Sequence, residues 1–420
     1  MAYIDFRKAY DSVSHGWIFA MLEIFKFHKN IVNTLRRCMA QWQTRMLVTS
    51  KDQSVTTEPI VIARGIFQGD SLSPLLFCLA LTPISRELER MNCGYEIKFD
   101  DLTYMIAQLL FMDDIKLYSP SSGQLQSMIR TVELVANDVG LTFGLSKCAV
   151  LHMVCGRIDY KDPILGCSGQ EFQQLDRGGY YKYLSFMEAT DVPHETIKSS
   201  LMHEFGIRLK QLLESHLNAG NLARAVNCYA LPVLSYSFGI IHLTRHELKQ
   251  IDRMFRKTLT DYGVHHPRAA VERLYLARKN RGQGFLLAEE LHDRIVLGIY
   301  QYLCKEAEHS PRLALLLQHH GHRKVHSVVK CATEFASTLM PEGNASTLGK
   351  ATIKEKCHQK MVSLREKPLH GQFCVGDLSF SWLRVAMLKP PSEGKGVSCS
   401  GSGSEHAQFA SCMGQSCWRR

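Results

Sequence analysis

The stretch "QLLFMDDIKLYS", residues 108–119, constrains the fold more than any other part of the chain. Two adjacent aspartates, Asp113 and Asp114, stand between apolar runs that need to be buried. An isolated buried charge is avoided in folded proteins unless it is paired or coordinates a metal ion. The stretch therefore predicts a tight β-hairpin that presents two carboxylates. An Asp-Asp pair by itself is more often an ordinary surface turn, so its meaning depends on what accompanies it.

The composition is that of a globular protein with a basic bias. The 420 residues are 45% hydrophobic and 21% charged, and 50 Lys and Arg exceed 40 Asp and Glu, which gives a net charge of +10. This charge is compatible with a nucleic-acid partner, although many basic proteins bind none. The 14 cysteines include no C-x-x-C pair, which argues against a zinc ribbon or a disulfide framework. No leader or membrane-spanning run is evident, so we expect no membrane partner and a location in the nucleus or cytoplasm.

Periodicity divides the chain into a mixed region and a helical region. Up to about residue 190 it predicts helices at 29–41 and 123–138, a hairpin within 44–63, and strands on both sides of Asp113. A long helix is predicted to start at Ser73, with Ser73 as its N-cap and Pro74 in its first turn. This mixture favours an α+β fold with an antiparallel sheet and helices on one face. Beyond 190 helical periodicity dominates, and residues 391–420 are Ser/Gly-rich, which predicts a disordered tail.

Three further segments accompany the Asp-Asp pair. Asp5 ends the first predicted strand, "ARGIFQGDSLSPLLF" combines glycines with a helix start, and "GLTFGLSKC" contains Lys147. Transfer of a nucleotide to a growing strand uses two divalent cations about 3.5–4 Å apart. Magnesium-type cations prefer carboxylate oxygens, which aspartates on neighbouring strands can supply. Asp100 and Asp101 lie in a predicted polar turn, and we expect them to be solvated.

In this order, "DFRKAYD", "RGIFQGDSLSPLLF", "FMDD", "GLTFGLSKC" and "YKYL" resemble reverse transcriptase motifs A to E. The first two motifs resemble most closely those of non-LTR, LINE-like retrotransposon enzymes. The resemblance spans residues 1–190 and implies a polymerase palm, an α+β domain with an antiparallel sheet and packed helices. It further implies an all-helical, thumb-like region at 191–330, which a helical C-terminal region at 331–390 would follow.

The resemblance assigns the chemistry residue by residue. It makes Asp5 and Asp113 metal ligands, with Asp114 in support, for two Mg²⁺ ions, or Mn²⁺ in their place. Lys147 matches the lysine that protonates the departing pyrophosphate. A solvated surface lysine is an equally good interpretation of Lys147.

The same resemblance assigns substrate contacts. Tyr10 matches the aromatic residue that guards against a 2′-hydroxyl on the incoming nucleotide, although it also fits a core aromatic. Gln68 and Gly69 match positions beside the nascent base pair, where glycine allows close backbone approach. Tyr183 lies in a segment, 181–184, that matches the primer-grip hairpin. There the family usually has glycine where this chain has Ser185, which would be strained if the position requires a positive φ.

A helix predicted near residues 244–263 carries a regular basic stripe. The basic residues recur every four positions: Arg245, Lys249, Arg253 and Lys257. The apolar residues of the other face are Leu248, Ile251, Phe255 and Leu259. Such a ridge suits contact with a nucleic-acid backbone, although a solvated helix face gives the same pattern. The histidines at 265–266 and 319–322 lack matching ligand spacing, so we expect polar surface there.

Two functions remain open from the sequence. Only four residues precede Asp5, so we expect an N-terminally truncated enzyme without the fingers that grip the nucleotide. The first function is an RNA-directed DNA polymerase that uses an RNA template, a DNA primer and deoxynucleoside triphosphates. The second is a catalytically inactive retroelement remnant that at most binds RNA or DNA.

Overall fold

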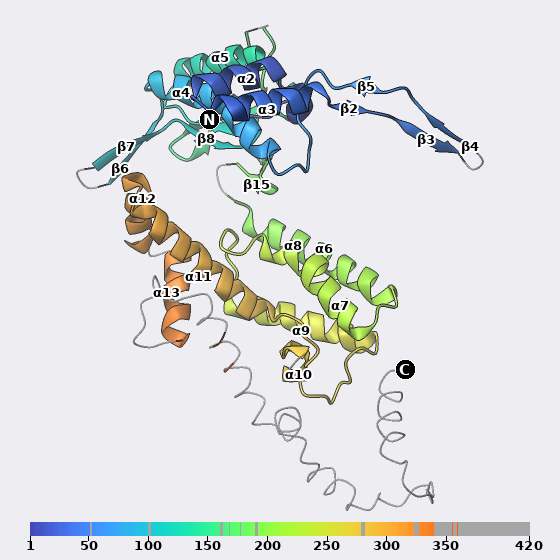
Figure 1. Cartoon of the computed structure of the whole chain (residues 1–420). Helices are drawn as coiled ribbons and strands as arrows, with labels where there is room; N and C mark the ends of the chain where they lie inside the picture. Colours follow the sequence, from blue (N-terminus) through green and yellow to red (C-terminus); the bar gives the residue numbers. More distant parts are fainter. Residues whose placement is uncertain are drawn as a thin grey trace, which may run out of the picture. The chain divides into compact units, whose positions relative to one another are not determined.

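The structure is a computed structural model. It describes residues 1–50, 53–99, 102–159, 163–167, 169–176, 178–189, 192–278, 282–322 and 327–339, together with 355 and 359. The chain forms two compact units, Met1–Pro193 and a second that begins at His194. Figure 1 shows the mixed strands and helices of the first and the helices of the second. The expected α+β class is confirmed for the first unit.

Strand β1 (Ala2–Ile4) lies at the centre of the five-stranded sheet of the first unit, whose order is β13-β10-β1-β9-β8. It pairs antiparallel with β9 (Asp114–Leu117) on one side and with β10 (Ala149–Val150) on the other. Strand β8 (Gln108–Phe111) forms the predicted hairpin with β9. The sheet is not antiparallel throughout, because β10 pairs in parallel with β13 (Gln173–Gln174).

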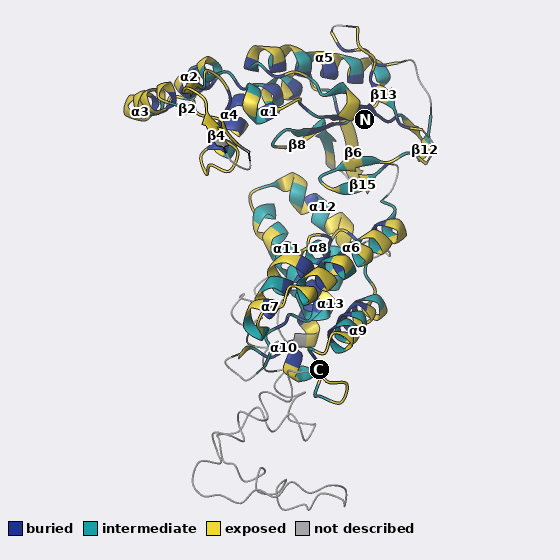
Figure 2. Ribbon diagram, turned by 90° about the vertical axis from the view of Figure 1, so that its right-hand side faces the viewer, coloured by how far each residue is buried: buried dark blue, intermediate teal, exposed yellow. Residues whose placement is uncertain are grey.

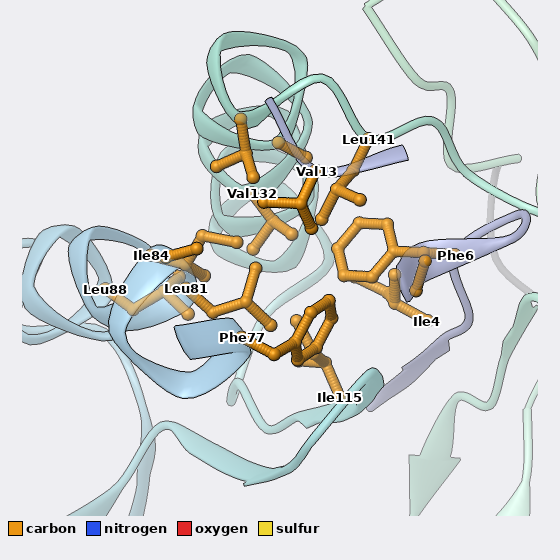
Figure 3. Packing of buried hydrophobic residues seen from close by; sticks show 14 of the residues in the cluster. Ile4, Phe6, Val13, Phe77, Leu81, Ile84, Leu88, Ile115, Val132 and Leu141 are labelled. Atoms are coloured by element: carbon orange, nitrogen blue, oxygen red, sulfur yellow. The ribbon is translucent and has the colours of Figure 1, made fainter. Parts of the chain in front are cut away.

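Three helices cover one face of this sheet: α2 (His15–Ile24), α4 (Ser73–Arg90) and α5 (Ser122–Val139). Figure 3 shows how their apolar side chains meet those of the strands. Ile4 and Ile115 project from β1 and β9 towards Phe77 on α4, and all three are at most 1% exposed. Burying a large apolar side chain contributes about 1.5–3 kcal/mol, so this shared core fixes the sheet against the helices.

The predicted helix cap at Ser73 is wrong. Helix α4 begins at Ser73, Leu72 is its N-cap, and no side chain caps the helix. Ser73 is 1% exposed, and its hydroxyl has no hydrogen-bond partner among the described residues. Pro74 does lie in the first turn as expected, because its fixed φ suits that position. The proline therefore located the helix start, but tertiary packing placed Ser73 inside the helix.

The remaining elements of the first unit are short. The helices are α1 (Ala9–Ser12), α3 (Lys29–Ala40) and the 3₁₀ turn η1 (Leu145–Lys147). The paired strands are β2 (Gln43–Thr44) with β5 (Ile60–Val61), β3 (Leu47–Ser50) with β4 (Gln53–Thr56), β6 (Tyr95–Phe99) with β7 (Leu102–Ile106), β11 (Met153–Val154) with β12 (Arg157–Ile158), and β14 (Tyr181–Tyr183) with β15 (Phe186–Glu188). The hairpin predicted within 44–63 is confirmed, and Figure 1 shows it as an arm that extends from α3.

The described elements of the second unit are helices. They are α6 (His194–Glu214), α7 (Ala219–Ala225), the π-helix η2 (Val226–Ala230), α8 (Leu231–Ser235), α9 (Arg245–Asp261), α10 (Glu272–Tyr275), α11 (Ala288–Ala307), α12 (Pro311–His322) and α13 (Val328–Leu339). Phe205, Phe255 and Phe285 are buried together between α6, α9 and the segment before α11. None of the described helices has the length and hydropathy needed to span a membrane.

Helix α9 has the amphipathic character that the sequence predicts. Leu248, Ile251, Phe255 and Leu259 are buried, and the four basic residues of the stripe are exposed. Figure 2 shows this division along α9. The expectation for the histidine pair after the helix is partly wrong, because His265 is only 7% exposed. Its backbone N–H donates to Leu259 O at 3.2 Å, which folds the chain back onto the helix and takes the ring inside.

Several expectations lie outside the described residues. These include the turn with Asp100 and Asp101, most of the predicted region 331–390, and the predicted tail at 391–420.

Candidate active site

Asp5 and Asp114 meet at one end of the central strand pair. Ile4 on β1 lies opposite Ile115 on β9, and the chains run antiparallel. Asp5 follows Ile4 and Asp114 precedes Ile115, so the two aspartates extend from adjacent positions at the same edge of the sheet. The paired strands thus bring together residues more than 100 positions apart in sequence. The predicted meeting of a strand-end aspartate with the hairpin carboxylates is confirmed.

Asp113 lies in the tight turn between β8 and β9, in which Phe111 pairs with Asp114. The turn places Met112 at φ 55°, a left-handed conformation that is uncommon for a residue with a side chain. The hydroxyl of Tyr10 contacts the Met112 Sδ at 3.7 Å, and the Tyr10 ring stacks on Phe77 with centroids 4.7 Å apart. Tyr10 therefore packs against the core and also borders the carboxylate turn, a position compatible with both interpretations of it.

Backbone and side-chain groups contact Asp5 on several sides. Gly144 N donates to Asp5 O at 2.8 Å, and a Cβ added to Gly144 would lie 3.2 Å from Asp5 Oδ1. Cys148 is buried beside the same residue, and its Sγ accepts from Asp5 N at 3.4 Å. The Lys147 Nζ lies 3.5 Å from Asp5 Oδ1, although the lysine side chain is 71% exposed. Sequence patterns did not single out Gly144 or Cys148, because both act through contacts between segments distant in sequence.

The carboxylates destabilise one another's charged forms. Burial raises the pKa of Asp5 above its ordinary value; Lys147 opposes this rise and the charge of Asp113 adds to it. Burial also raises the pKa of Asp114, and here the charges of Asp113 and Asp5 both add to the rise. Like charges held close together shift each other in this way. A cation bound among these oxygens would reverse the effect.

Residues 65–69, which follow the β2–β5 arm, pack against the segment that begins with Asp5, through Gly65. Gly65 has φ 85°, and a Cβ there would meet the backbone oxygen of Asp11 at 2.7 Å. Its carbonyl lies 2.8 Å from the Nε2 of His15, a contact that sequence analysis missed. Gln68 and Gly69 are exposed, and Gly69 has φ 94° with open space around its Cα. The segment thus offers an accessible backbone at the positions predicted to lie beside a base pair.

The β14–β15 hairpin lies against the outer face of the sheet. Burial, followed by the charge of Asp114, raises the pKa of Tyr183 to about 12. The two turn residues, Leu184 and Ser185, have φ 46° and 69°. Ser185 therefore has the positive φ for which the sequence predicts strain, because a position of this kind favours glycine.

The basic stripe on α9 is not uniform. Both carboxylate oxygens of Asp293 on α11 accept from Arg245 Nη1 at 2.6 Å, so Arg245 is part of an interhelical ion pair. Lys249, Arg253 and Lys257 are exposed on α9, at the spacing expected for contacts with a nucleic-acid backbone. Three of the four basic residues of the stripe, Lys249, Arg253 and Lys257, are therefore available to contact such a backbone.

The donor chemistry of the site fits hard divalent cations. Asp5, Asp113 and Asp114 supply carboxylate oxygens at one edge of the sheet, where the charge of Asp113 adds to the rise that burial causes in the pKa values of Asp5 and Asp114. Within the described part of the chain, no three ligating side chains gather closely enough to hold an ion by themselves. Magnesium usually keeps several waters and uses substrate phosphates as further ligands, so an open protein site is compatible with it.

Comparison with known proteins agrees with this geometry. Residues 1–190 match the family described as reverse transcriptase (RNA-dependent DNA polymerase). This part of the chain is therefore a reverse transcriptase domain.

The relatives that it matches include Pol polyproteins of retrotransposable elements. A Pol polyprotein of a type-1 retrotransposable element R2 from Popillia japonica is 26% identical over 61% of this chain and 41% of its own length. One from Nasonia vitripennis is 25% identical over 62% of this chain and 24% of its own, and the type-2 R2DM polyprotein of Drosophila melanogaster is 24% identical over 61% and 24%. The chain thus spans less than half the length of these relatives.

A solved structure of telomerase from Candida albicans, in complex with a fragment of telomeric RNA, is also similar. It has a TM-score of 0.29 and 14% identity, and the match covers 83% of this chain and 49% of that one. This score is too low to carry an argument about fold or ligand.

Proposed function

We propose that this chain is an RNA-directed DNA polymerase that extends a DNA primer on an RNA template with deoxynucleoside triphosphates. The observation that carries the proposal is the meeting of Asp5 and Asp114 at one edge of the sheet, beside the turn with Asp113. Burial and the charge of Asp113 raise the pKa values of both aspartates, and a cation bound beside them would offset this repulsion. The location of this activity would be the nucleus or the cytoplasm.

In this mechanism Asp5, Asp113 and Asp114 would hold the two Mg²⁺ ions, or Mn²⁺ in their place. Bound there, the ions would supply Lewis-acid activation of the primer 3′-oxygen and stabilisation of the charge on the transferred phosphate. Lys147 is exposed and close to Asp5, where its ammonium can donate a proton to the departing pyrophosphate.

The other residues orient the substrates. The Tyr10 ring, stacked on Phe77, borders the sugar of the incoming nucleotide and opposes a 2′-hydroxyl. Gln68 and Gly69 lie along the nascent base pair, and Tyr183 supports the primer end. Lys249, Arg253 and Lys257 contact phosphates of the duplex, and such contacts make binding weaken as salt is raised.

The test is extension of a DNA primer on an RNA template by the full chain in Mg²⁺ or Mn²⁺. We expect Asp113→Asn to reduce the extension rate by about a thousandfold, because the ions supply several kcal/mol of transition-state stabilisation. The matched control, Asp138→Asn, changes an exposed aspartate on α5 and should leave the rate unchanged.

The alternative is a retroelement remnant that binds nucleic acid without extending it. The left-handed Ser185 in the primer hairpin favours a weak or inactive enzyme. Salt-sensitive binding of primer–template with equal background incorporation by the wild type and Asp113→Asn would establish this alternative.

A further inference from the structure

The sheet face opposite the helices carries a buried lysine. Lys116 lies on β9, two residues after Asp114, and side chains two apart on a strand share a face. Ile115 and Leu117 belong to the core under the helices, whereas Lys116 points to the other side. Lys116 is nevertheless only 4% exposed. An ammonium group buried in this way needs partners that replace water.

Aromatic rings and one carboxylate surround this ammonium. The Nζ lies 5.1 Å from the ring centre of Tyr3, 5.3 Å from that of Tyr118 and 5.5 Å from that of Tyr183. It also donates to Oε1 of Glu188 on β15. Cations within about 6 Å of a ring face are attracted by it, more strongly when water is excluded. Lys116 thereby connects the strand that bears Asp114 to both strands of the β14–β15 hairpin.

A second anchor connects the same hairpin to β1. The rings of Tyr3 and Tyr181 stack with centroids 4.2 Å apart and planes inclined by 17°. The Tyr181 hydroxyl donates to Lys147 O at 2.7 Å. Tyr3 precedes Asp5 by two residues, as Lys116 follows Asp114 by two. Each anchor therefore lies on the strand and face of one of the carboxylates that form the candidate active site.

An ion pair is not the simplest way to cover this face. Apolar side chains of similar volume would cover it equally well, and replacing both members of a buried ion pair in this way is often neutral or stabilising. A directional contact between Lys116 and Glu188 instead fixes the register of one element on another. The two-residue turn requires Leu184 and Ser185 to adopt the left-handed conformation, which is costly for residues with side chains and persists only when the surrounding structure enforces it.

We propose that Lys116 is a positioning residue for the primer. Through Glu188 and the tyrosine rings it fixes the β14–β15 hairpin relative to Asp5 and Asp114, and so sets where the primer 3′-end lies. The inference rests on the proposed function in so far as a primer is the ligand.

The experiment uses the full chain with an RNA template and a DNA primer whose 3′-terminal base is 4-thiothymidine. After illumination, crosslinks are mapped by mass spectrometry, and kcat for extension is measured with an unmodified primer. In the wild type we expect crosslinks within residues 181–188. Lys116→Met should reduce them and kcat by about tenfold to a hundredfold, because a misplacement of about 1 Å has effects of this size. The KM for deoxynucleotides and the affinity for the duplex should change by less than about twofold, since phosphate contacts dominate affinity.

Three variants separate positioning from general damage. Lys116→Arg should restore crosslinks and kcat, because a guanidinium can pair with Glu188 and stack on the rings. Glu188→Gln should act as Lys116→Met does. Lys210→Met is the matched control: it makes the same change at an exposed lysine of α6, outside the sheet and the hairpin, so it should change neither readout.

The outcomes are distinct from those for the proposed function. If Lys116→Met and Glu188→Gln both give crosslinks and kcat equal to those of the wild type, the inference is overturned. If Lys116→Met does not fold, crosslinks and kcat are compared between Glu188→Gln and Lys116→Arg. Equal values in these two variants would then overturn the inference. Hairpin crosslinks that depend on Lys116, in a chain that does not extend its primer, would support the inference while refuting the polymerase.

Discussion

The two units of the chain treat their acidic side chains in opposite ways. In the first unit, burial and like charges raise the pKa values of Asp5 and Asp114. In the second, Asp293 accepts from Arg245, and Glu247 accepts from Lys198 at 2.7 Å. These bonds to Lys198 and to Thr244, whose side chain forms a capping box with Glu247, outweigh burial and lower the pKa of Glu247 to about 2. Glu247 and Asp293 thus stabilise the fold of the second unit, whereas Asp5 and Asp114 of the first are held against the charge of a neighbouring carboxylate.

The backbone shows the same contrast. Of the described non-glycine residues with a positive φ, all but His216 lie in the first unit: Lys8, Lys26, Asn92, Met112, Cys155, Leu184 and Ser185. Met112 borders the carboxylate turn, and Leu184 and Ser185 form the turn of the β14–β15 hairpin. Unfavourable conformations of this kind gather at functional sites, where the surrounding structure enforces them. The raised pKa values of Asp5 and Asp114 and most of these positive φ values thus both occur in the first unit.

The largest expected effect that tests this contrast is on the ion pair between α9 and α11. Asp293→Ala should destabilise the second unit by about 3 kcal/mol, because a partly buried Arg245 loses its partner. The value is at the lower end for a broken buried pair, since the arginine side chain is 46% exposed and regains some water. Hydrogen exchange of the α9 and α11 amides in the full chain measures the loss.

The control changes a half-buried ion pair within α11 itself. Glu290→Gln removes the partner of Arg294 at 3.5 Å, four residues away along the helix. Such pairs contribute a few tenths of a kcal/mol, about 0.3–0.5, so exchange should hardly change. Equal losses in the two variants would show that Asp293 is not a structural carboxylate.

Asp252 is the exception within the second unit and gives the next largest effect. Burial raises its pKa to about 6, although Ala288 N and Glu289 N donate to its carboxylate at 2.9 and 3.3 Å. The folded state therefore binds the proton more tightly than the unfolded state does. The associated stability is present below about pH 4 and is lost as pH rises through about 6. We expect a loss of nearly 3 kcal/mol across this window, because each pH unit between the unfolded and the folded pKa corresponds to about 1.4 kcal/mol.

Hydrogen exchange of α11 at several pH values, corrected for intrinsic rates, measures this loss. Asp252→Asn should remove it, because the amide oxygen still accepts from Ala288 N but does not titrate. Glu247 acts in the opposite sense: its pKa is lowered, so its contribution is lost only as pH falls from about 4.5 towards 2. Stability that rose between pH 4 and 6 would contradict the assignment to Asp252.

Local pattern was enough to predict much of the first unit. The alternation around Asp113 and Asp114 predicted the hairpin, and the position of Asp5 at a strand end predicted where the carboxylates meet. These features depend on neighbours in sequence, for which strand and helix periods are informative. The buried face of α9 was predicted for the same reason.

The partners of charged residues could not be predicted in this way. Arg245 was assigned to a nucleic-acid stripe, and only the fold shows that Asp293, 48 residues away, binds it. His265 was expected on the surface and is buried for a similar reason. Lys116 and Glu188 are 72 residues apart and carry no shared motif. Such contacts are set by which elements pack together, which no local period encodes.

The smallest expected effect concerns the strain in the turn of the β14–β15 hairpin. Ser185 has φ 69°, and a side chain in this conformation costs about 1 kcal/mol, which glycine avoids. Ser185→Gly should therefore slow hydrogen exchange in β14 and β15 by a few-fold, equivalent to about 0.5–1 kcal/mol. The control, Ser215→Gly, alters a serine of the second unit that precedes the left-handed His216 and should leave the hairpin unchanged. If the polymerase proposal is correct, the glycine variant should also extend primers faster, because the hairpin spends more time in the conformation that holds the primer. Unchanged exchange in β14 and β15 would mean that the turn at Ser185 is not strained, and the contrast between the units would then rest on their carboxylates.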